Sequence, residues 1–269
     1  MSPHTGSYAY GTFASNEAEL ARLESQATVA WALEKQMLAQ AGLRAGMAVL
    51  DLACGPGFIT ERIAHVVGPE GRVIGLDINP DLLDVARSRP AAAGAAELDF
   101  RCMDTYDMAL AEASVDFVYA RFLFQHLARP QRALAQIRRV LRPGGTVNIV
   151  DVDDGILGLW PEPPGYAEFT RMVAEAQRRR GGDRLVGRKL GYLLKTAGFS
   201  DVRLDVAVIT TDRIPMRSFL DITTGFKREL VPPSQRPAAE ETLERIYAHA
   251  LAGEAFGIVG VYSAAAVRA

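Results

Sequence analysis

Two short stretches decide the fold: Val49-Leu50-Asp51-Leu52-Ala53-Cys54-Gly55-Pro56-Gly57, and Val73-Ile74-Gly75-Leu76-Asp77, whose last residue lies twenty positions after Gly57. The apolar run before Asp51 is typical of a buried strand, and the small residues after it let a ligand approach the backbone before the next helix. The second stretch predicts a neighbouring parallel strand that ends in an acid. In doubly wound sheets a carboxylate there accepts hydrogen bonds from ribose hydroxyls. Together they predict a nucleotide-type cofactor on a parallel sheet.

The rest of the chain alternates between strand-like and helix-like segments. We expect strands at 48–52, 72–77, 98–103, 115–119, 146–150, 201–209 and 256–267, with helices at 58–67, 80–88, 130–141 and 187–197. Arg142-Pro143-Gly144-Gly145 predicts a turn before the fifth strand. Strands separated by helices favour an α/β fold whose sheet is mostly parallel, with right-handed crossovers and helices on both faces.

Three segments lie outside this alternation. Residues 1–44 are expected to form an N-terminal flap followed by a helix over 17–41, and residues 45–269 the main domain. Within that domain, residues 155–182 and 213–252 interrupt the pattern with Pro-rich and helical stretches. Insertions at strand ends commonly form substrate lids, so we expect these two segments to be lid elements.

The composition excludes several classes of function. Across 269 residues, 49% are hydrophobic, 23% are charged and the net charge is -2. Nucleic acid is therefore not an expected partner, because phosphate binding requires clustered excess Lys and Arg. Cys54 and Cys102 are the two cysteines, and they form neither a disulfide framework nor a metal-ligand pair. With no apolar run long enough to span a bilayer, we expect a cytoplasmic protein without a metal or a membrane partner.

Beyond the first two stretches, further motifs give the chain a family resemblance. They are Gly75-Leu76-Asp77-Ile78, Cys102-Met103-Asp104, Gln125-His126-Leu127 and Arg139-Val140-Leu141-Arg142-Pro143-Gly144-Gly145. With residues 51–57, these motifs resemble the class I S-adenosylmethionine-dependent methyltransferases, in particular the small-molecule branch of the ubiquinone/menaquinone-biosynthesis type. The resemblance covers about residues 45–199. It implies a Rossmann-like sheet of seven strands with an antiparallel last strand, S-adenosyl-L-methionine as cofactor and S-adenosyl-L-homocysteine as product.

The resemblance also implies roles for the residues of the first two motifs. Asp51 should help to hold the methionine amino group, and Asp77 should accept from the two ribose hydroxyls, with Ile78 against adenine. Ala53, Gly55 and Gly57 should stay small because methionine and ribose pass against the backbone; Ala53 departs from the commoner glycine. The alternatives are a strand-end turn residue for Asp77 and a helix cap for Asp51.

Further cofactor contacts are implied downstream and at the N-terminus. Asp104 should accept from the adenine amine, and Met103 or Thr105 should line the same pocket. Arg121 follows the fourth strand. In the family, residues at this place lie near the methionine moiety and the acceptor. Tyr8 and Gln26 resemble positions that close over the cofactor in related enzymes, with simple packing as the alternative.

Two residues are candidates for catalysis, because a hydroxyl acceptor benefits from a general base whose pKa lies near the working pH. His126 lies near the strand ends, although Gln125-His126-Leu127 also occurs in the family as a packing element. Asp151, with Asp153 and Asp154, follows the fifth strand; one of these acids is expected to orient a substrate, or all three to cap a turn.

The acceptor is expected to be a hydrophobic small molecule, natural-product or quinone-like. Aromatic and apolar candidates for its pocket are Trp160, Tyr166, Phe169, Met172, Phe219 and Phe226, with ordinary core packing as the alternative. A nicotinamide-dependent dehydrogenase is disfavoured because residues 55–60 lack the small third residue of that fingerprint. A protein of the same fold that binds the cofactor without methylating, such as a cyclase or a regulatory partner, stays open, as does a homo-oligomer.

Overall fold

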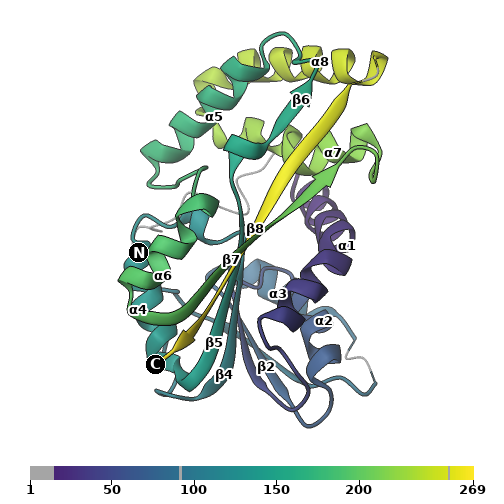
Figure 1. The fold of residues 1–269 in the computed structure, drawn as a ribbon. Coiled ribbons are helices and arrows are strands. Elements are labelled where there is room, and N and C mark those ends of the chain that lie inside the picture. The colour runs from purple at the N-terminus through teal and green to yellow at the C-terminus, as the bar shows by residue number, and fades with distance from the viewer. Residues whose placement is uncertain (1–14, 91–92, 254) are drawn as a thin grey trace.

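One mixed sheet forms the centre of the molecule (Figure 1). The computed structural model describes residues 15–90, 93–253 and 255–269, and in these ranges eight strands follow the order β3-β2-β1-β4-β5-β8-β6, with β7 on the other side of β8. Their bounds are β1 Ala48–Leu52, β2 Arg72–Asp77, β3 Glu97–Cys102, β4 Val115–Arg121, β5 Leu141–Val152, β6 Gly158–Trp160, β7 Phe199–Thr210 and β8 Phe256–Arg268.

The strand directions confirm the predicted architecture. Strands β1 to β5 pair in parallel, whereas β8 runs antiparallel to β5, β6 and β7. The strand beyond the expected seven is β6, a three-residue strand inside the segment predicted as an insertion. It pairs with the N-terminal end of β8, next to the part of β8 that pairs with β5.

One predicted turn lies inside a strand. β5 begins at Leu141 instead of Thr146, and the expected turn at 142–145 is part of it. Leu141 pairs with Val115, and the next pairing joins Thr146 to Phe117, so four residues of β5 bulge out opposite a single residue of β4. The Pro143-Gly144-Gly145 sequence therefore forms a bulge within β5, and the strand continues through it.

The strand order reverses at β1, and this reversal positions the site. β1 pairs with β2 on one side and with β4 on the other. The connections that leave the C-terminal ends of β1 and β4 therefore diverge to opposite faces. Open α/β sheets bind ligands in the crevice that this divergence creates.

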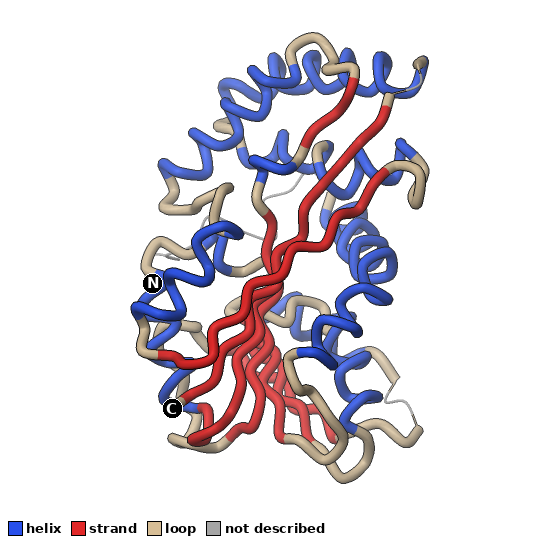
Figure 2. The backbone as a smooth tube through the Cα atoms, viewed as in Figure 1, coloured by secondary structure: helices blue, strands red, loops and turns tan. Residues whose placement is uncertain are grey.

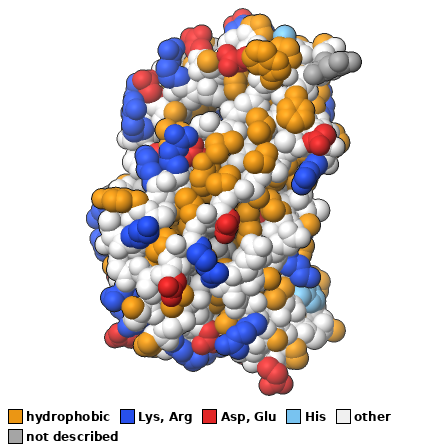
Figure 3. All heavy atoms as spheres, in the orientation of Figure 1, with side chains coloured by type: hydrophobic (Ala, Val, Ile, Leu, Met, Phe, Trp, Pro, Cys, Tyr) orange, Lys and Arg blue, Asp and Glu red, His pale blue; other side chains and the backbone are white. Residues whose placement is uncertain are grey.

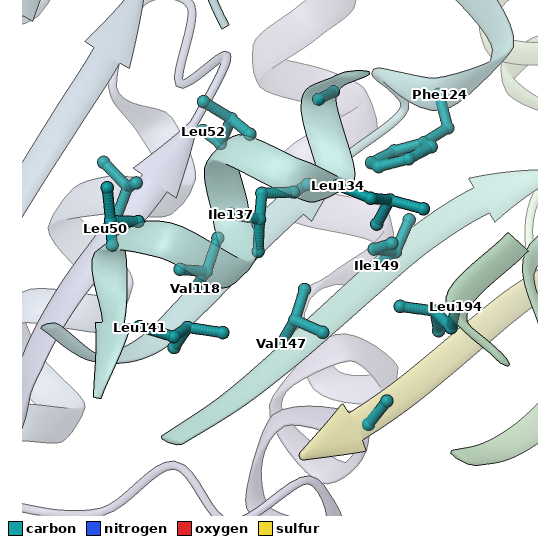
Figure 4. Packing of buried hydrophobic residues seen from close by; sticks show 14 of the residues in the cluster. Leu50, Leu52, Val118, Phe124, Leu134, Ile137, Leu141, Val147, Ile149 and Leu194 are labelled. Atoms are coloured by element: carbon teal, nitrogen blue, oxygen red, sulfur yellow. The ribbon is translucent and has the colours of Figure 1, made fainter. Parts of the chain in front are cut away.

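Helices cover both faces of the sheet (Figure 1). α1 (Asn16–Gln40) and α2 (Phe58–Val67) pack over Val49 and Phe117, while α4 (Pro130–Val140) and α6 (Leu190–Thr196) pack over Leu50 and Val118. Figure 4 shows the second of these cores, with side chains of α4 lying against β4 and β5. α3 (Pro80–Ser88) follows β2 and contacts β3. Adjacent strand residues face opposite sides, so each strand contributes to both cores.

The two segments predicted as lid elements pack on each other beyond the C-terminal ends of the parallel strands (Figure 2). We call α5 (Tyr166–Arg179), α7 (Met216–Thr223), η4 (Gly225–Leu230) and α8 (Arg236–Ala252) the helical cap. The cap has its own core, which includes Phe169, Val173, Phe219, Leu243 and Ile246. Its role as a lid stays a prediction.

α1 begins at Asn16, one residue before its predicted start. Ser15 caps the helix by accepting from the Ala18 N–H at 3.1 Å, and Glu17 and Glu19 lie in the first turn, where the helix dipole favours acids. The helix contacts both α2 and α7, so it joins the sheet to the helical cap. Tyr8 and the proposed flap lie outside the described residues.

The edge of the sheet at β7 is unusually apolar. Leu204, Val206 and Val208 are 41–44% exposed, and Figure 3 shows hydrophobic side chains gathered obliquely across this face of the molecule. A long apolar edge strand can pair with a strand of another chain.

In the described residues no helix combines the length and the apolar character needed to cross a membrane.

Candidate functional site

A cavity of about 560 Å³ opens where the strand order reverses. Its volume is in the range of small-molecule sites. The predicted cofactor residues that line it are Gln26, Asp51, Ala53, Gly55, Asp77, Ile78, Met103, Asp104, Thr105 and Arg121. The same cavity continues to His126 and to apolar side chains of α7, β7 and β8. The fold thus brings together residues that are spread over most of the chain.

Asp51 lies at the end of β1 with only 2% of its surface exposed. Its carboxylate accepts from the Thr60 hydroxyl at 2.6 Å, and Thr60 belongs to α2. Burial raises the pKa of Asp51 to about 7, against the opposing effects of Thr60 and Arg121. A cation bound in the cavity would stabilise the ionised carboxylate, which is the property needed to hold an ammonium group.

The loop after β1 adopts three left-handed conformations, at Ala53 (φ 61°), Gly55 (φ 54°) and Gly57 (φ 78°). A Cβ at Gly55 would meet no atom within 4 Å, so this glycine leaves open space beside the cavity that it lines. Gly57 is different: it does not line the cavity, and its Cβ would lie 3.0 Å from Cβ of Ala86 and 3.1 Å from Phe100. The structure therefore places Gly57 where a helix packs on a strand, and not in the lining of the cavity.

Asp77 lies at the end of β2, on the opposite side of this loop. One carboxylate oxygen accepts from the Gly55 N–H and the other from the Asn79 N–H, both at 2.9 Å. Burial raises the pKa of Asp77, and these backbone bonds oppose that shift. Each oxygen keeps a lone pair for a further donor. The next residue, Ile78, is 45% exposed and lines the cavity. Its apolar surface is therefore available to contact a ligand.

The residues after β3 combine turn and pocket roles. Asp104 accepts from the Tyr106 N–H at 2.8 Å and so caps a turn, yet it also lines the cavity beside Met103. The Thr105 hydroxyl oxygen is buried and has no hydrogen-bond partner among the described residues. A buried polar atom without a partner beside a cavity marks a place for a polar ligand group. These observations fit an adenosine moiety at this end.

Arg121 connects the end of β4 to α1. Its Nε donates to Glu34 at 2.7 Å, and its Nη2 donates to the backbone carbonyl of Gln26 at 3.4 Å. Glu34 is completely buried and also accepts from the Tyr119 hydroxyl at 3.2 Å. The predicted positions Arg121 and Gln26 therefore lie together, and the ion pair with Glu34 holds α1 against the cavity.

The structure argues against His126 as a general base. Burial, aided by the positive charges of Arg184 and Arg22, lowers the pKa of His126 to about 3. The imidazole is therefore neutral at pH 7 and holds an accepted proton poorly. Its Nδ1 lies 3.5 Å from Nε2 of Gln177, so the ring is positioned by α5. His126 lines the cavity as a neutral polar group.

Asp151 does not reach the cavity, which corrects its predicted role in orienting a substrate. It is fully buried and accepts from the backbone N–H groups of Gln125 (3.1 Å) and Val152 (2.9 Å). It therefore stabilises the turn η1 (Phe124–His126), which carries the histidine. Asp153 likewise accepts from Arg188 and caps η2 (Asp154–Ile156). The acid of this cluster that lines the cavity is Asp154.

The far end of the cavity is mainly apolar, but only one expected aromatic residue contributes to it. Its lining there includes Phe122, Leu157, Ile209, Ile222, Phe226, Val259 and Val261. Of the predicted candidates, Phe226 is in this set. Trp160 is 75% exposed, and Tyr166, Phe169 and Phe219 belong to the core of the helical cap, with Met172 packed against it. For these residues the alternative of core or surface packing holds, because Trp160 lies exposed at the end of β6 and the others pack in or against the core of the helical cap.

Comparison with known proteins supports this geometry. The family described as "Methyltransferase domain" matches residues 49–145, which contain β1, β2, β3, β4 and the start of β5. This stretch carries Asp51, Asp77 and Asp104 in the positions just described. Residues 49–145 form a class I methyltransferase domain.

Curated proteins are similar in sequence to parts of this chain. An uncharacterized 37.1 kDa protein in transposon Tn4556 of Streptomyces fradiae is 35% identical over 185 residues, or 68% of this chain and 52% of its own length. The ubiquinone/menaquinone biosynthesis C-methyltransferase UbiE of Ralstonia pickettii is 37% identical over 114 residues, covering 42% of this chain and 46% of its own length. The chain thus spans about half the length of these relatives.

Solved structures share the fold of most of this chain. Phosphoethanolamine N-methyltransferase 2 of Haemonchus contortus, in complex with S-adenosyl-L-methionine, superimposes with a TM-score of 0.55 at 18% identity over 88% of this chain and 52% of that one. The [4+2]-cyclase SpnF superimposes with a TM-score of 0.57 at 20% identity over 88% of this chain and 80% of that one. At these identities the likeness establishes the fold alone.

Sequence analysis did not identify several residues that lie in or beside the cavity. Glu34 is an acid on the buried face of α1. A charged residue on a mostly apolar helix face is the signal by which sequence analysis could have identified it. Arg22 and Arg184 also line the cavity, but no motif distinguishes them from the many other arginines. Arg184 donates to Asp154 at 2.7 and 2.8 Å and also to the side chain of Gln125. It therefore connects η2 to the turn that carries His126.

Proposed function

We propose that this protein is an S-adenosylmethionine-dependent methyltransferase that acts on a hydrophobic small molecule of natural-product or quinone-like type. The observation that carries the proposal is the continuity of one cavity. Its first end is lined by the loops of the methyltransferase domain, and its second end by apolar side chains of α7, β7 and β8. A cofactor at the first end and an acceptor at the second would share one enclosed site.

The side chains at the first end suit S-adenosyl-L-methionine. Asp77 would bind the ribose hydroxyls and Asp51 the amino group. Asp104 and the Thr105 hydroxyl would bind the adenine edge. Open space beside Gly55 and the exposed Ile78 side chain leave room for the sugar and the base. When bound, the cofactor supplies an electrophilic methyl group. The chain's own contribution is to orient both ligands and to exclude water from the space between them.

A second function on the same fold is a cyclase or a regulatory protein that binds the cofactor without consuming it. The structural likeness to SpnF favours keeping this alternative. Cofactor-binding residues do not discriminate between the two, because they report binding and not transfer. Conversion of S-adenosylmethionine to S-adenosylhomocysteine in the presence of an acceptor distinguishes them, since a cyclase leaves the cofactor unchanged.

The experiment that tests the proposal is calorimetric titration of the purified chain with S-adenosylmethionine and S-adenosylhomocysteine. We expect micromolar binding by the wild type and at least about tenfold weaker binding by Asp77→Ala, because charge-assisted hydrogen bonds to the ribose are lost. Asp84→Ala is the matched control, since that carboxylate lies on α3 with 75% exposure and outside the cavity. Absence of binding by a folded wild type would refute the cofactor assignment.

A further inference from the structure

Buried positive charge gathers at the acceptor end of the cavity. Arg22 from α1 and Arg184 from the segment after α5 both line it, with side chains 12% and 4% exposed. We propose that the acceptor carries a negatively charged oxygen group, a carboxylate or an ionised hydroxyl, which Arg22 and Arg184 receive. This inference rests on the proposed function and specifies its substrate class.

The first step of the argument is a charge imbalance around Asp154. Arg184 donates to both oxygens of Asp154, and Lys227 of η4 donates to the same carboxylate at 2.9 Å. Lys227 is fully buried. Among the described residues in direct contact, one carboxylate therefore serves two cations. A buried excess of positive charge that opposite charge does not balance is costly, so this cluster favours an anion.

Asp151, the other acid near Arg184, offsets little of this excess. Its two oxygens accept from backbone N–H groups, and it lies outside the cavity. Burial also raises the pKa of Asp151 to about 7, so it carries only part of a negative charge at neutral pH. Burial is the main cause of the lowered pKa of His126, and the positive charges of Arg184 and Arg22 lower it further.

Arg22 brings a second guanidinium to the same wall. It donates to Glu19 of its own helix at 2.6 and 2.8 Å, and its guanidinium carbon lies 4.3 Å from the ring centre of Phe226. Phe226 also lines the cavity. A ring-stacked guanidinium presents donors at its edge, so this arrangement suits an aromatic ligand that bears an anionic group.

The charges along the cavity have opposite signs at its two ends. Asp51, Asp77 and Asp104 outnumber Arg121 at the cofactor end, whereas Arg22 and Arg184 outnumber Asp154 at the acceptor end. The acidic end suits the cationic cofactor of the proposed function, and the basic end suits an anionic acceptor. An acceptor held in its ionised form needs no proton removed, which agrees with a cavity whose histidine is a poor base.

The test uses a matched pair of probes, 2-naphthoate and 2-naphthamide, which share one ring system and differ in charge. Calorimetric titrations are run on the full chain with and without S-adenosylhomocysteine. We expect the carboxylate to bind at least about tenfold more tightly than the amide. In Arg22→Gln the preference should fall to about threefold or less, whereas Arg217→Gln, an exposed arginine on α7 outside the cavity, should keep it.

Equal binding of the two probes, or a preference that survives Arg22→Gln, would overturn the inference. Thermal unfolding checks that the variant is folded; if it is not, Arg22→Lys replaces it and should retain a preference for the carboxylate. Failure of S-adenosylhomocysteine to bind would instead refute the proposed function. The preference for 2-naphthoate over 2-naphthamide is also measured without S-adenosylhomocysteine. A failure of this inference can therefore be distinguished from a failure of the proposed function.

Discussion

At the scale of single residues, Ala53 shows how a local departure from the family pattern is tolerated. It adopts φ 61°, a region that costs an L-residue about 1–2 kcal/mol, where glycine adopts it freely. We expect Ala53→Gly to raise the unfolding free energy by about 0.5 kcal/mol, because the relief of strain exceeds the roughly 0.4–1 kcal/mol of added unfolded-state entropy. Urea denaturation measures the change.

Ala113 provides the control for Ala53, since it has φ 50° and lies outside the cavity. Ala113→Gly should give a similar gain in unfolding free energy without any effect on cofactor binding. A loss of stability in both variants would show that the left-handed conformation is not a source of strain in this chain.

Asp51 is expected to make stability depend on pH. Its pKa rises from 3.8 to about 7 on folding, so between these values the folded state retains a proton that the unfolded state has lost. The contribution of Asp51 therefore lowers the unfolding free energy as pH rises from about 4 to 7. Asp51→Asn, which does not titrate, should show a shallower decline than the wild type over this range.

Asp84→Asn is the control for this pH series, because Asp84 is 75% exposed. It should keep the wild-type slope, and so should any substitution away from the buried acids. Identical slopes for Asp51→Asn and the wild type would mean that Asp51 is already ionised at low pH. Asp77 and Asp151, whose pKa values are also raised by burial, contribute the slope that remains.

At the scale of elements, the contact of Lys227 with Asp154 ties η4 of the helical cap to η2, which follows the sheet. The two partners should respond unequally to substitution. Asp154→Asn leaves Arg184 and Lys227 buried without a carboxylate and should cost about 3–5 kcal/mol. Lys227→Met removes a cation whose pKa burial already lowers to about 8, and leaves Asp154 paired with Arg184, so it should cost about 1 kcal/mol or less.

Chemical denaturation of the two variants measures this asymmetry, and limited proteolysis shows which element loosens first. Cleavage should begin in the helical cap of Asp154→Asn, because the contact that anchors η4 is the one lost. Equal losses in the two variants would indicate that the charge excess around Asp154 is compensated elsewhere.

At the scale of the whole molecule, the exposed edge at β7 is a surface that can pair with other chains. Val206 is 44% exposed on this edge, and a charge placed there should block strand addition. We expect Val206→Lys to leave the unfolding free energy within about 0.5 kcal/mol of the wild type. It should also raise the fraction that stays soluble on heating, measured by light scattering.

Val206→Thr keeps the branched shape without the charge and serves as the control for this edge. It should aggregate more than Val206→Lys. Aggregation that is equal in the wild type and both variants would assign the process to another surface.

The strand–loop–helix–strand unit of residues 49–77 could be predicted from sequence because its signals are local. A buried strand, a run of small residues and a terminal acid each follow from neighbours within a few positions, and the alternation of strands and helices then specifies the parallel sheet. The positions of Asp51, Gly55 and Asp77 at the cavity agree with that interpretation. The bulge in β5 and the short strand β6 were missed, because pairing partners and not local propensity decide them.

What only the tertiary structure decided depends on partners far apart in the chain. Glu34 meets Arg121 across 87 positions, and Lys227 meets Asp154 across 73. The partial burial of His126 and the complete burial of Asp151 likewise result from the packing of separate elements, and they change the chemistry that these side-chain types suggest. Local patterns thus predict where a cofactor can lie, whereas charge and protonation in the cavity follow from which distant side chains folding brings together.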